Sequence, residues 1–326
     1  MHIGRRWRDD PRNLLLRPFD GSPDDHTSLA RVRNATLRAI SLPEDFTEVT
    51  AEDMRQFYGR PGYTLADNAW LFFLGDRPIA AAVLFPRSLF HDRQPGNFDL
   101  YVDPDYWRHG IGSRLLAHLE QAAVARGHRV LETTIALEDA QSNAFLVRHG
   151  FAVVGQLMHL TRHTMDNLPT PAVPEGYTLR SLADLNESSD LYMQTANRLG
   201  SYDSGYSLIR PEEMESIAGS PAWDPEGVLF AFDPTGRIVG LIRASVSAGG
   251  RGYLHEIRIE PASRGLGLGR AMLAASLQYL ARRGALSGDL DTAGDNTAAH
   301  GLALKAGFIV TRHWLHYLRR LAVPTV

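Results

Sequence analysis

The stretch Ser263–Leu273 reads SRGLGLGRAML and has glycine at every second position from 265 to 269. It follows the segment YLHEIRIE (residues 253–260), which alternates like a strand, and it runs into a helical pattern over residues 270–284. Glycine lets the backbone approach a ligand closely. The free N–H groups at the start of a helix attract anions. A strand, a bare turn and a helix in this order therefore predict a phosphate-binding site.

Two common phosphate-binding motifs do not fit this turn. A P-loop requires lysine after its last glycine, but Arg270 follows Gly269. A dinucleotide-binding turn requires GxGxxG, and the sixth position is Arg270 when counted from Gly265 and Met272 when counted from Gly267. The pattern that does fit is R-x-x-G-x-G, formed by Arg264, Gly265, Leu266, Gly267, Leu268 and Gly269.

A related segment, with the same two final glycines, occurs earlier in the chain. EIRIEPASRGLGLGRAML surrounds Gly267 and DLYVDPDYWRHGIGSRLL surrounds Gly110, at an offset of 267 − 110 = 157 residues. Three further pairs share this offset: Pro104 and Pro261, Gly127 and Gly284, Gly150 and Gly307. Repeat arrays usually have shorter periods, so a duplicated domain is indicated. We predict domains at residues 1–168 and 169–326, joined near the proline-containing segment 166–177.

Hydrophobic periodicity gives the same order of elements in both halves. In the second half it predicts strands at residues 177–182, 253–260, 285–292 and 308–321, and a hairpin that turns at residues 233–236. Helices are predicted at residues 188–199, 210–219, 270–284 and 296–307. The predicted fold class is α/β of the α+β type, with two tandem domains that each contain a mixed, mostly antiparallel sheet flanked by helices.

Composition narrows the functional classes. The chain has 326 residues, 44% of them hydrophobic, a net charge of −3 and no cysteine. The absence of cysteine excludes disulfides, thiolate metal sites and a cysteine nucleophile. We expect no nucleic-acid partner, because such proteins are strongly basic. We also expect no membrane span and no signal peptide, and hence a cytoplasmic protein.

The strand, the R-x-x-G-x-G turn and the helix together resemble the GCN5-related N-acetyltransferases. A second motif, Asn296-x-x-Ala299 before Gly307-Phe308, agrees with this resemblance. It implies acetyl-CoA or another acyl-CoA as co-substrate and no metal. It also implies that the turn holds the pyrophosphate while the preceding strand and Asn296 bind the pantetheine arm. The implied acyl-CoA residues are Ile257, Arg258, Ile259, Arg264, Gly265, Leu266, Gly267, Leu268, Gly269, Arg270 and Asn296.

The first half departs from the family pattern. Trp107 occupies the usual Arg or Gln position, and Asp139 replaces the helix asparagine. This half either binds CoA, or shapes the acceptor pocket, or holds the second half in place. The corresponding acyl-CoA residues would be Leu100, Tyr101, Val102, Arg108, His109, Gly110, Ile111 and Gly112.

Acyl transfer without a cysteine predicts direct attack of an amine on the thioester, which requires a base. Glu256 is the candidate, because alternation places it with Arg258 on the face opposite Ile257 and Ile259. The alternative is a Glu256 that only pairs with Arg258. Its first-half counterpart is Asp99, which has a shorter reach. A zinc site at His255-Glu256 is rejected, because HExxH would need histidine at Ile259.

The general acid is missing from its usual place. Many relatives carry tyrosine four residues before the glycine of the final GF pair, but this chain has Ala303 there and Leu146 in the first half. Either the thiolate leaves without that acid or another group on the last strand, Tyr317 or His316, replaces it. The acceptor region is expected at residues 193–223, which include Tyr202, Asp203 and Tyr206.

The sequence therefore predicts an acyl-CoA-dependent N-acyltransferase that acetylates a primary amine of a small molecule, with the chemistry in the second half. One alternative is a non-catalytic acyl-CoA-binding or scaffold protein. Another concerns the acceptor: the segment AWDPEG (residues 222–227) is loosely similar to mycothiol synthase-like proteins, which also have two fused domains. We expect the two domains to pack on each other, which is compatible with a monomer.

Overall fold

The computed structural model describes residues 14–40, 46–58, 64–85, 96–203, 206, 208–247 and 249–322. These residues form two compact units. Unit 1 contains the described residues up to 154 together with residues 316–322, and unit 2 contains the described residues from 155 to 315.

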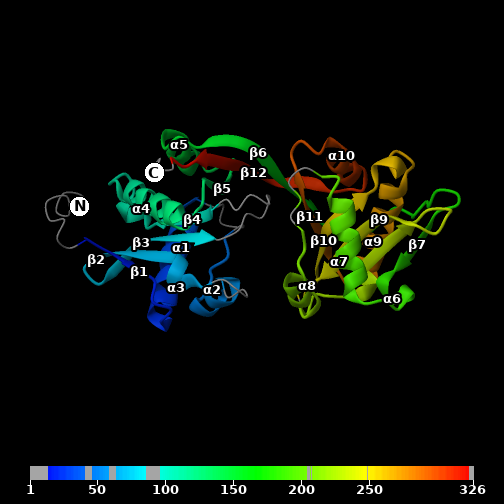
Figure 1. Ribbon diagram of the computed structural model, residues 1–326, viewed down its shortest axis with the longest axis horizontal. Coiled ribbons are helices and arrows are strands. Elements are labelled where there is room, and N and C mark those ends of the chain that lie inside the picture. The colour runs from blue at the N-terminus through cyan, green and yellow to red at the C-terminus, as the bar shows by residue number, and fades with distance from the viewer. Residues whose placement is uncertain are drawn as a thin grey trace. The chain divides into compact units, whose positions relative to one another are not determined.

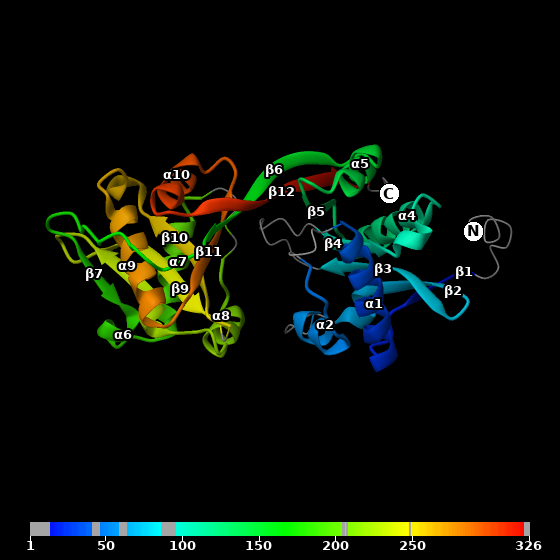
Figure 2. The same cartoon turned by 180° about the vertical axis from the view of Figure 1, so that it is seen from behind.

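Unit 1 is a helix-flanked sheet (Figure 1). Its strands lie in the order β1 (Leu14–Pro18), β2 (Ala69–Leu74), β3 (Arg77–Phe85), β4 (Gly96–Val102) and β5 (Val130–Ala136), and the end of β12 (Ile309–Arg320) lies beside β5. Figures 1 and 2 show helices on both faces of these strands. The helices are α1 (Pro23–Ile40), α2 (Ala51–Tyr58), α3 (Leu65–Asn68), α4 (Ile111–Ala125) and α5 (Ala140–Arg148).

Unit 2 has the same design. Its strands lie in the order β7 (Thr178–Ser181), β8 (Val228–Phe232), β9 (Ile238–Val246), β10 (Arg251–Ile259), β11 (Ser287–Ala293) and β6 (Ala152–Arg162). Only β10 and β11 run parallel within this series. The helices are α6 (Leu182–Leu185), α7 (Ser189–Gly200), α8 (Pro211–Ala218), α9 (Leu268–Arg282) and α10 (Thr297–Lys305). The predicted fold class, α/β of the α+β type with mixed and mostly antiparallel strands flanked by helices, is confirmed.

The last strand of each sequence half belongs to the sheet of the other half. Strand β6 precedes the linker, yet it pairs antiparallel with β11 from Gly288↔Arg162 to Ala293↔Leu157. Strand β12 ends in unit 1, where the Leu321 amide donates to the Arg129 carbonyl at 2.9 Å. The compact units follow these contacts. The division at residue 168 follows the sequence repeat and stays a prediction.

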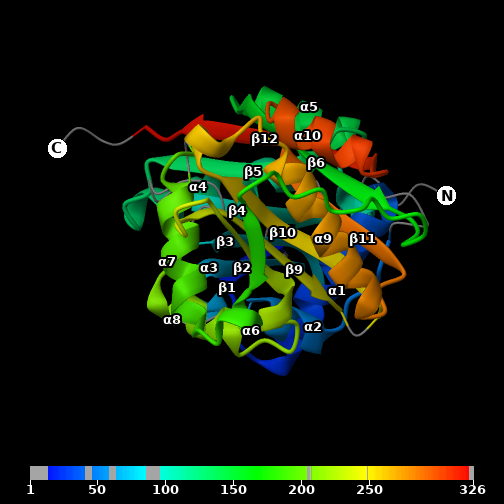
Figure 3. The same ribbon diagram turned by 90° about the vertical axis from the view of Figure 1, so that its right-hand side faces the viewer.

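The sheet of unit 2 lies between two apolar layers. On one face, α9 buries Met272, Leu273, Leu277 and Leu280, as its periodicity predicts. On the other face, Tyr192 and Leu199 of α7 pack with Phe230 and Leu241. Figure 3, which looks at this unit, shows α7 and α9 on either side of β9 and β10. Each buried large side chain contributes about 1.5–3 kcal/mol, so the sheet is held from both faces, and β10 itself is anchored on the α9 side through Leu254.

Candidate active site

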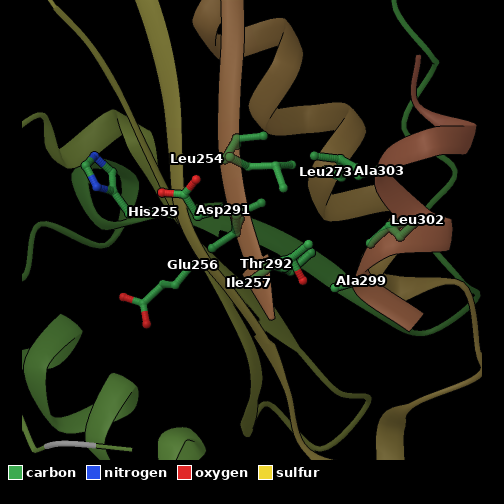
Figure 4. Close-up of a pocket in the computed structure, with 12 residues that line it drawn as sticks. Leu254, His255, Glu256, Ile257, Leu273, Asp291, Thr292, Ala299, Leu302 and Ala303 are labelled. Carbon is green, nitrogen blue, oxygen red and sulfur yellow. The ribbon is translucent and has the colours of Figure 1, made fainter. Parts of the chain in front are cut away.

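Strands β10 and β11 separate part-way along their length. Their parallel pairing runs from Arg251↔Ser287 to Leu254↔Leu290 and ends there. The opening that follows leads into a pocket. Figure 4 shows that one side of this pocket carries Leu273, Leu302 and Ala303 from the helices, and the other side carries polar groups of the two strands. The pocket thus joins an apolar side of the sheet to a polar side.

A bulge in β10 sets which side chains reach the polar side. Leu254 pairs with Ala244 of β9, but Glu256 pairs with Arg243, so His255 is an extra residue in the ladder. His255 and Glu256 consequently point to the same side of the strand (Figure 4). Simple alternation over residues 253–260 missed this bulge. The signal was present in the sequence, because Leu254 and Ile257 are both apolar although they lie three residues apart.

The glycine turn has separate physical reasons for its three glycines. Gly265 has φ +80° and Gly267, the residue that precedes α9, has φ +92°. A Cβ at either position would meet nothing within 4 Å, so the backbone there is open to a ligand. A Cβ at Gly269 would lie 3.3 Å from Ile259 Cδ1 and 3.4 Å from Leu302 Cδ2, so this glycine allows close packing of α9. The turn therefore has an open backbone at Gly265 and Gly267, which we call the cradle, followed by a tightly packed helix start at Gly269.

Two basic side chains flank the glycine turn in the sequence, and Asn296 lies at the start of α10. Arg264 Nε donates to the Ile259 carbonyl at 2.9 Å, which ties the turn to the end of β10, and its side chain is 53% exposed. Arg270, in the first turn of α9, is exposed. Asn296 precedes α10 and its side-chain oxygen accepts from the Ala299 amide at 3.1 Å. The oxygen of Asn296 thus caps the helix, and its NH₂ group is a hydrogen-bond donor; the role of Asn296 in binding pantetheine stays a prediction.

Glu256 is oriented by two neighbours. Arg258 Nε donates to its Oε2 at 2.7 Å, and the Tyr192 hydroxyl donates to its Oε1. Arg243 Nε in turn donates to the Tyr192 hydroxyl at 3.1 Å. Burial and the nearby Glu256 charge raise the pKa of Tyr192, so its hydroxyl remains a donor at neutral pH. The ion pair with Arg258, which belongs to the alternative interpretation of Glu256, is present, and the role of Glu256 as a base stays a prediction.

The loop after α7 reaches this cluster. Asp203 Oδ2 accepts from Arg258 Nη1 at 2.5 Å, and the guanidinium carbon of Arg258 lies 4.3 Å from the centre of the Tyr206 ring. The Tyr202 hydroxyl donates to Glu260 Oε1 at 3.3 Å. Tyr202, Asp203 and Tyr206, the three residues singled out in the expected acceptor region, therefore lie around the end of β10. Their role in acceptor binding stays a prediction.

Many relatives carry a tyrosine at the position of Ala303 in α10. No residue of the last strand takes the place of that tyrosine in the pocket wall. Ala303 lines the pocket and is 1% exposed. Tyr317 and His316 belong to unit 1, where the Tyr317 hydroxyl donates to Asn143 Oδ1 at 3.0 Å and His316 Nε2 lies 3.1 Å from Glu132 Oε2. Neither residue lines the pocket of unit 2.

The turn of unit 1 keeps the backbone shape of its counterpart in unit 2. Gly110 has φ +82° and precedes α4, and Arg108 holds φ +65° where unit 2 has glycine. A Cβ at Gly112 would lie 3.3 Å from the Phe145 ring. Asp139 caps α5 by accepting from the Ser142 amide at 3.0 Å, in the way that Asn296 caps α10. The shape of the cradle is preserved although its chemistry has changed.

The remaining predicted residues of the first half lie around this turn. Leu100, Tyr101 and Val102 end β4, which pairs with β5 only at Gly96↔Leu131 and Asn97↔Glu132. His109 lies in the turn, and Ile111 and Gly112 start α4. Asp99 accepts hydrogen bonds of 3.1 Å from both the Tyr58 and the Tyr101 hydroxyls. Burial raises the pKa of Asp99 even though these two bonds favour its charged form.

The described residues form neither a membrane-spanning helix nor a metal-binding cluster. None of the helices in the ranges given above is long and apolar enough to cross a membrane. In the same part of the chain, His, Asp and Glu side chains form no group of three that could hold a metal ion.

The model of the acetyltransferase (GNAT) family matches residues 34–151 and 200–308 of the chain. The two matched regions contain the two glycine turns and most of the two strand openings. The chain belongs to the acetyltransferase (GNAT) family. The predicted resemblance and the prediction of an N-acetyltransferase are thereby confirmed. Members of this family use acetyl-CoA or another acyl-CoA, and the acceptor is in general a small molecule.

Individual relatives agree with this assignment. The mycothiol acetyltransferase of Renibacterium salmoninarum is 31% identical over 231 residues, which cover 68% of this chain and 67% of that protein. The mycothiol acetyltransferase of Tsukamurella paurometabola is 29% identical over 224 residues, covering 66% of this chain and 75% of that protein.

Solved structures share the tandem fold. A GCN5-related N-acetyltransferase from Sphaerobacter thermophilus matches with a TM-score of 0.76 and 23% identity, over 97% of this chain and 98% of that one. A tandem GNAT protein from the clavulanic acid biosynthesis pathway matches with a TM-score of 0.67 and 20% identity, over 96% of this chain and 100% of that one. At these identities the likeness concerns the fold alone.

Proposed function

We propose that unit 2 transfers the acetyl group of acetyl-CoA to a primary amine of a small molecule, by direct attack in a ternary complex. The observation that carries this proposal is the position of the glycine turn at the end of β10, next to the opening between β10 and β11. A pyrophosphate in the cradle at Gly265 and Gly267 would leave the pantetheine arm to enter along the unpaired end of β10. The thioester would then lie at the pocket.

The cradle fits an acyl-CoA on two independent grounds. Its backbone is open where phosphate oxygens would have to approach, and the N–H groups at the start of α9 have no partners within the helix. Arg264 and Arg270 add positive charge at the rim. The backbone of Ile257, Arg258 and Ile259 lies past the last β10–β11 pair, so it is available to the amides of pantetheine.

The chemistry assigns one proton transfer to this chain. Glu256 removes a proton from the acceptor ammonium, either directly or through a water molecule. The nitrogen lone pair then attacks the thioester carbon, a C–N bond forms and the C–S bond breaks. The nitrogen gives up its second proton and the departing thiolate takes up one proton, so the products are the neutral amide and CoA, with one proton left on Glu256. Much of the rate gain comes from holding the two substrates together.

Unit 1 has the shape of an acyl-CoA site but a different set of side chains. We infer that the two sequence halves, residues 1–168 and 169–326, are duplicates, of which the second kept the activity. At the repeat offset of 157 residues, the uncharged indole of Trp107 corresponds to the charged guanidinium of Arg264. The first unit then serves chiefly to complete the fold.

A non-catalytic acyl-CoA-binding protein is the second candidate. The observation in its favour is Ala303, which leaves the pocket wall without the hydroxyl that an acid would supply. The mycothiol acetyltransferases among the relatives suggest an alternative acceptor, the substrate of those enzymes. Loss of turnover in a Glu256→Gln variant that still binds acetyl-CoA would exclude the non-catalytic protein.

Calorimetric titration with acetyl-CoA tests the proposed function. Gly267→Glu should abolish one binding site, because a bulky anion would occupy the cradle. Gly267→Ala is the control, since it brings the same backbone strain of about 1–3 kcal/mol without filling the site. Gly110→Glu tests the turn of unit 1 in the same way. A wild-type protein that does not bind acetyl-CoA would overturn the proposal.

A further inference from the structure

Asp291 of β11 lies on the polar side of the strand opening. It lines the same pocket as Glu256 and His255, and Figure 4 shows its carboxyl group on their side of the strands. Its side chain is 36% exposed. A carboxylate in this position would contact an acceptor that approaches the thioester from the polar side. The proposed reaction assigns no role to this carboxylate.

The Asp291 carboxylate is held from two sides. His159 Nδ1 lies 2.7 Å from its Oδ1, and the Tyr253 hydroxyl donates to its Oδ2. These two bonds outweigh the effect of burial, so the pKa of Asp291 is lowered and the group is charged at neutral pH. Each carboxylate oxygen still has a lone pair for a further donor. Asp291 is thus a fixed anion that can accept a hydrogen bond from a ligand.

His159 is itself fixed by a second carboxylate. Its Nε2 lies 3.2 Å from Asp289 Oδ1, and Asp289 accepts 2.7 Å bonds from Arg251 Nε and from the Thr161 hydroxyl. His159 and Thr161 come from β6, the strand that precedes the linker. The strand that completes the sheet of unit 2 therefore also brings the imidazole that orients Asp291.

A comparison of the two units at the offset of 157 residues shows which of these contacts occur in both units and which occur only in unit 2. At the offset of 157, His159 corresponds to His316 and Asp289 to Glu132, and this pair is also in contact in unit 1, at 3.1 Å. Asp291, however, corresponds to 291 − 157 = 134, a threonine, and Tyr253 to position 96, a glycine. The histidine–carboxylate pair accompanies the strand arrangement in both units. The Asp291–Tyr253 pair occurs only beside the turn that kept its arginine.

We propose that Asp291 is a specificity-determining residue that binds the ammonium group of the acceptor, with Tyr253 and His159 as positioning residues. The inference rests on the proposed function and names its acceptor class. The acceptor is an amine that is cationic at neutral pH and has no carboxylate next to its nitrogen. A neighbouring carboxylate would be repelled by Asp291, which disfavours α-amino acids.

Two pairs of probe amines test this class. Glycinamide and glycine differ by one carboxylate, as do tryptamine and tryptophan, and CoA release is measured with each. We expect wild type to favour the carboxylate-free member of each pair by kcat/KM. Asp291→Asn should raise KM for glycinamide and tryptamine about ten- to a hundredfold, since a hydrogen bond to a charged group is lost. It should bring the selectivity ratio toward one and leave the acetyl-CoA Kd unchanged.

A matched pair of variants separates positioning from stability. His159→Asn should raise KM for tryptamine and lower the selectivity ratio. His316→Asn removes the corresponding imidazole from unit 1, so it should leave both values unchanged. A ratio that is the same in wild type and Asp291→Asn would overturn the inference, as would a lack of CoA release with all four amines. Failure of wild type to bind acetyl-CoA is a different result and would overturn the proposed function itself.

Discussion

The indole Nε1 of Trp107 donates a hydrogen bond of 2.6 Å to the carbonyl oxygen of Val102. The same contact in unit 2, 157 residues later, is the 2.9 Å bond from Arg264 Nε to the Ile259 carbonyl. Both bonds tie the glycine turn to the end of its strand. The tryptophan thus makes the hydrogen bond that corresponds to that of the arginine, but it carries no positive charge.

This correspondence predicts that alanine at position 107 chiefly lowers stability, whereas alanine at position 264 chiefly weakens acetyl-CoA binding. Trp107→Ala should lower the free energy of unfolding of unit 1 by about 1 kcal/mol for the lost hydrogen bond, plus the loss of packing. Arg264→Ala should weaken acetyl-CoA binding more than it lowers stability. Thermal unfolding and calorimetry of both variants check this. If Trp107→Ala weakened acetyl-CoA binding as much as Arg264→Ala, the tryptophan would be part of a ligand site.

Glu256→Gln should reduce kcat by about 10²- to 10⁴-fold, the usual contribution of a general base. The acetyl-CoA Kd should not change, because the side chain faces the acceptor side of the opening. Steady-state kinetics of CoA release and calorimetry measure the two quantities. Asp99→Asn is the matched control at the same offset in unit 1. Equal losses of turnover in both variants would show that unit 1 takes part in the chemistry.

Acid pH should weaken unit 2 through Asp289. Burial opposes its charged form, but the bonds from Arg251 and Thr161 outweigh burial, and the pKa is lowered below its ordinary value. A lowered folded pKa stabilises the protein above the unfolded value of about 3.9, and this contribution is lost as the pH falls through the folded pKa.

Asp289→Asn should therefore be about 1–3 kcal/mol less stable than wild type at pH 7. The difference should shrink below about pH 3.9, where the wild-type carboxylate begins to be protonated in the unfolded chain. Urea unfolding of both proteins at several pH values measures it. A difference that is independent of pH would mean that the Asp289 charge does not stabilise the fold.

Truncation after Leu315 should destabilise unit 1 rather than unit 2. The missing residues include His316, which contacts Glu132, and Arg319, whose Nη1 donates to Glu120 at 2.5 Å and to the His149 carbonyl at 2.7 Å. Hydrogen exchange should accelerate in β5 while the amides of β8 and β9 stay protected. Arg319→Ala should show the same pattern more weakly. Faster exchange confined to unit 2 would contradict the strand assignment.

Local features of the fold could be predicted from sequence because each depends on nearby residues. The buried stripe of α9 follows from the 3.6-residue period of Met272, Leu273, Leu277 and Leu280. The turn at Gly265 and Gly267 follows from the backbone freedom of glycine. The repeat then extends both features to unit 1.

Features that depend on distant partners could not be predicted. The placement of β6 beside β11 leaves the alternation of β6 unchanged, so no local pattern reports it. For this reason the contact of His159 with Asp291, between residues 132 positions apart, was missed. The partners of Glu256 were found only in part: Arg258 is two residues away, whereas Tyr192 is 64 residues away.

The crossing of β6 and β12 into the opposite units has a consequence for dividing the chain. A chain cut at residue 168 would leave unit 2 without β6, which the first half supplies, and unit 1 without the end of β12, which the second half supplies. Each half therefore completes the other's strand order, whatever ligand its own turn binds. We expect either half to be less stable when expressed alone than within the full chain.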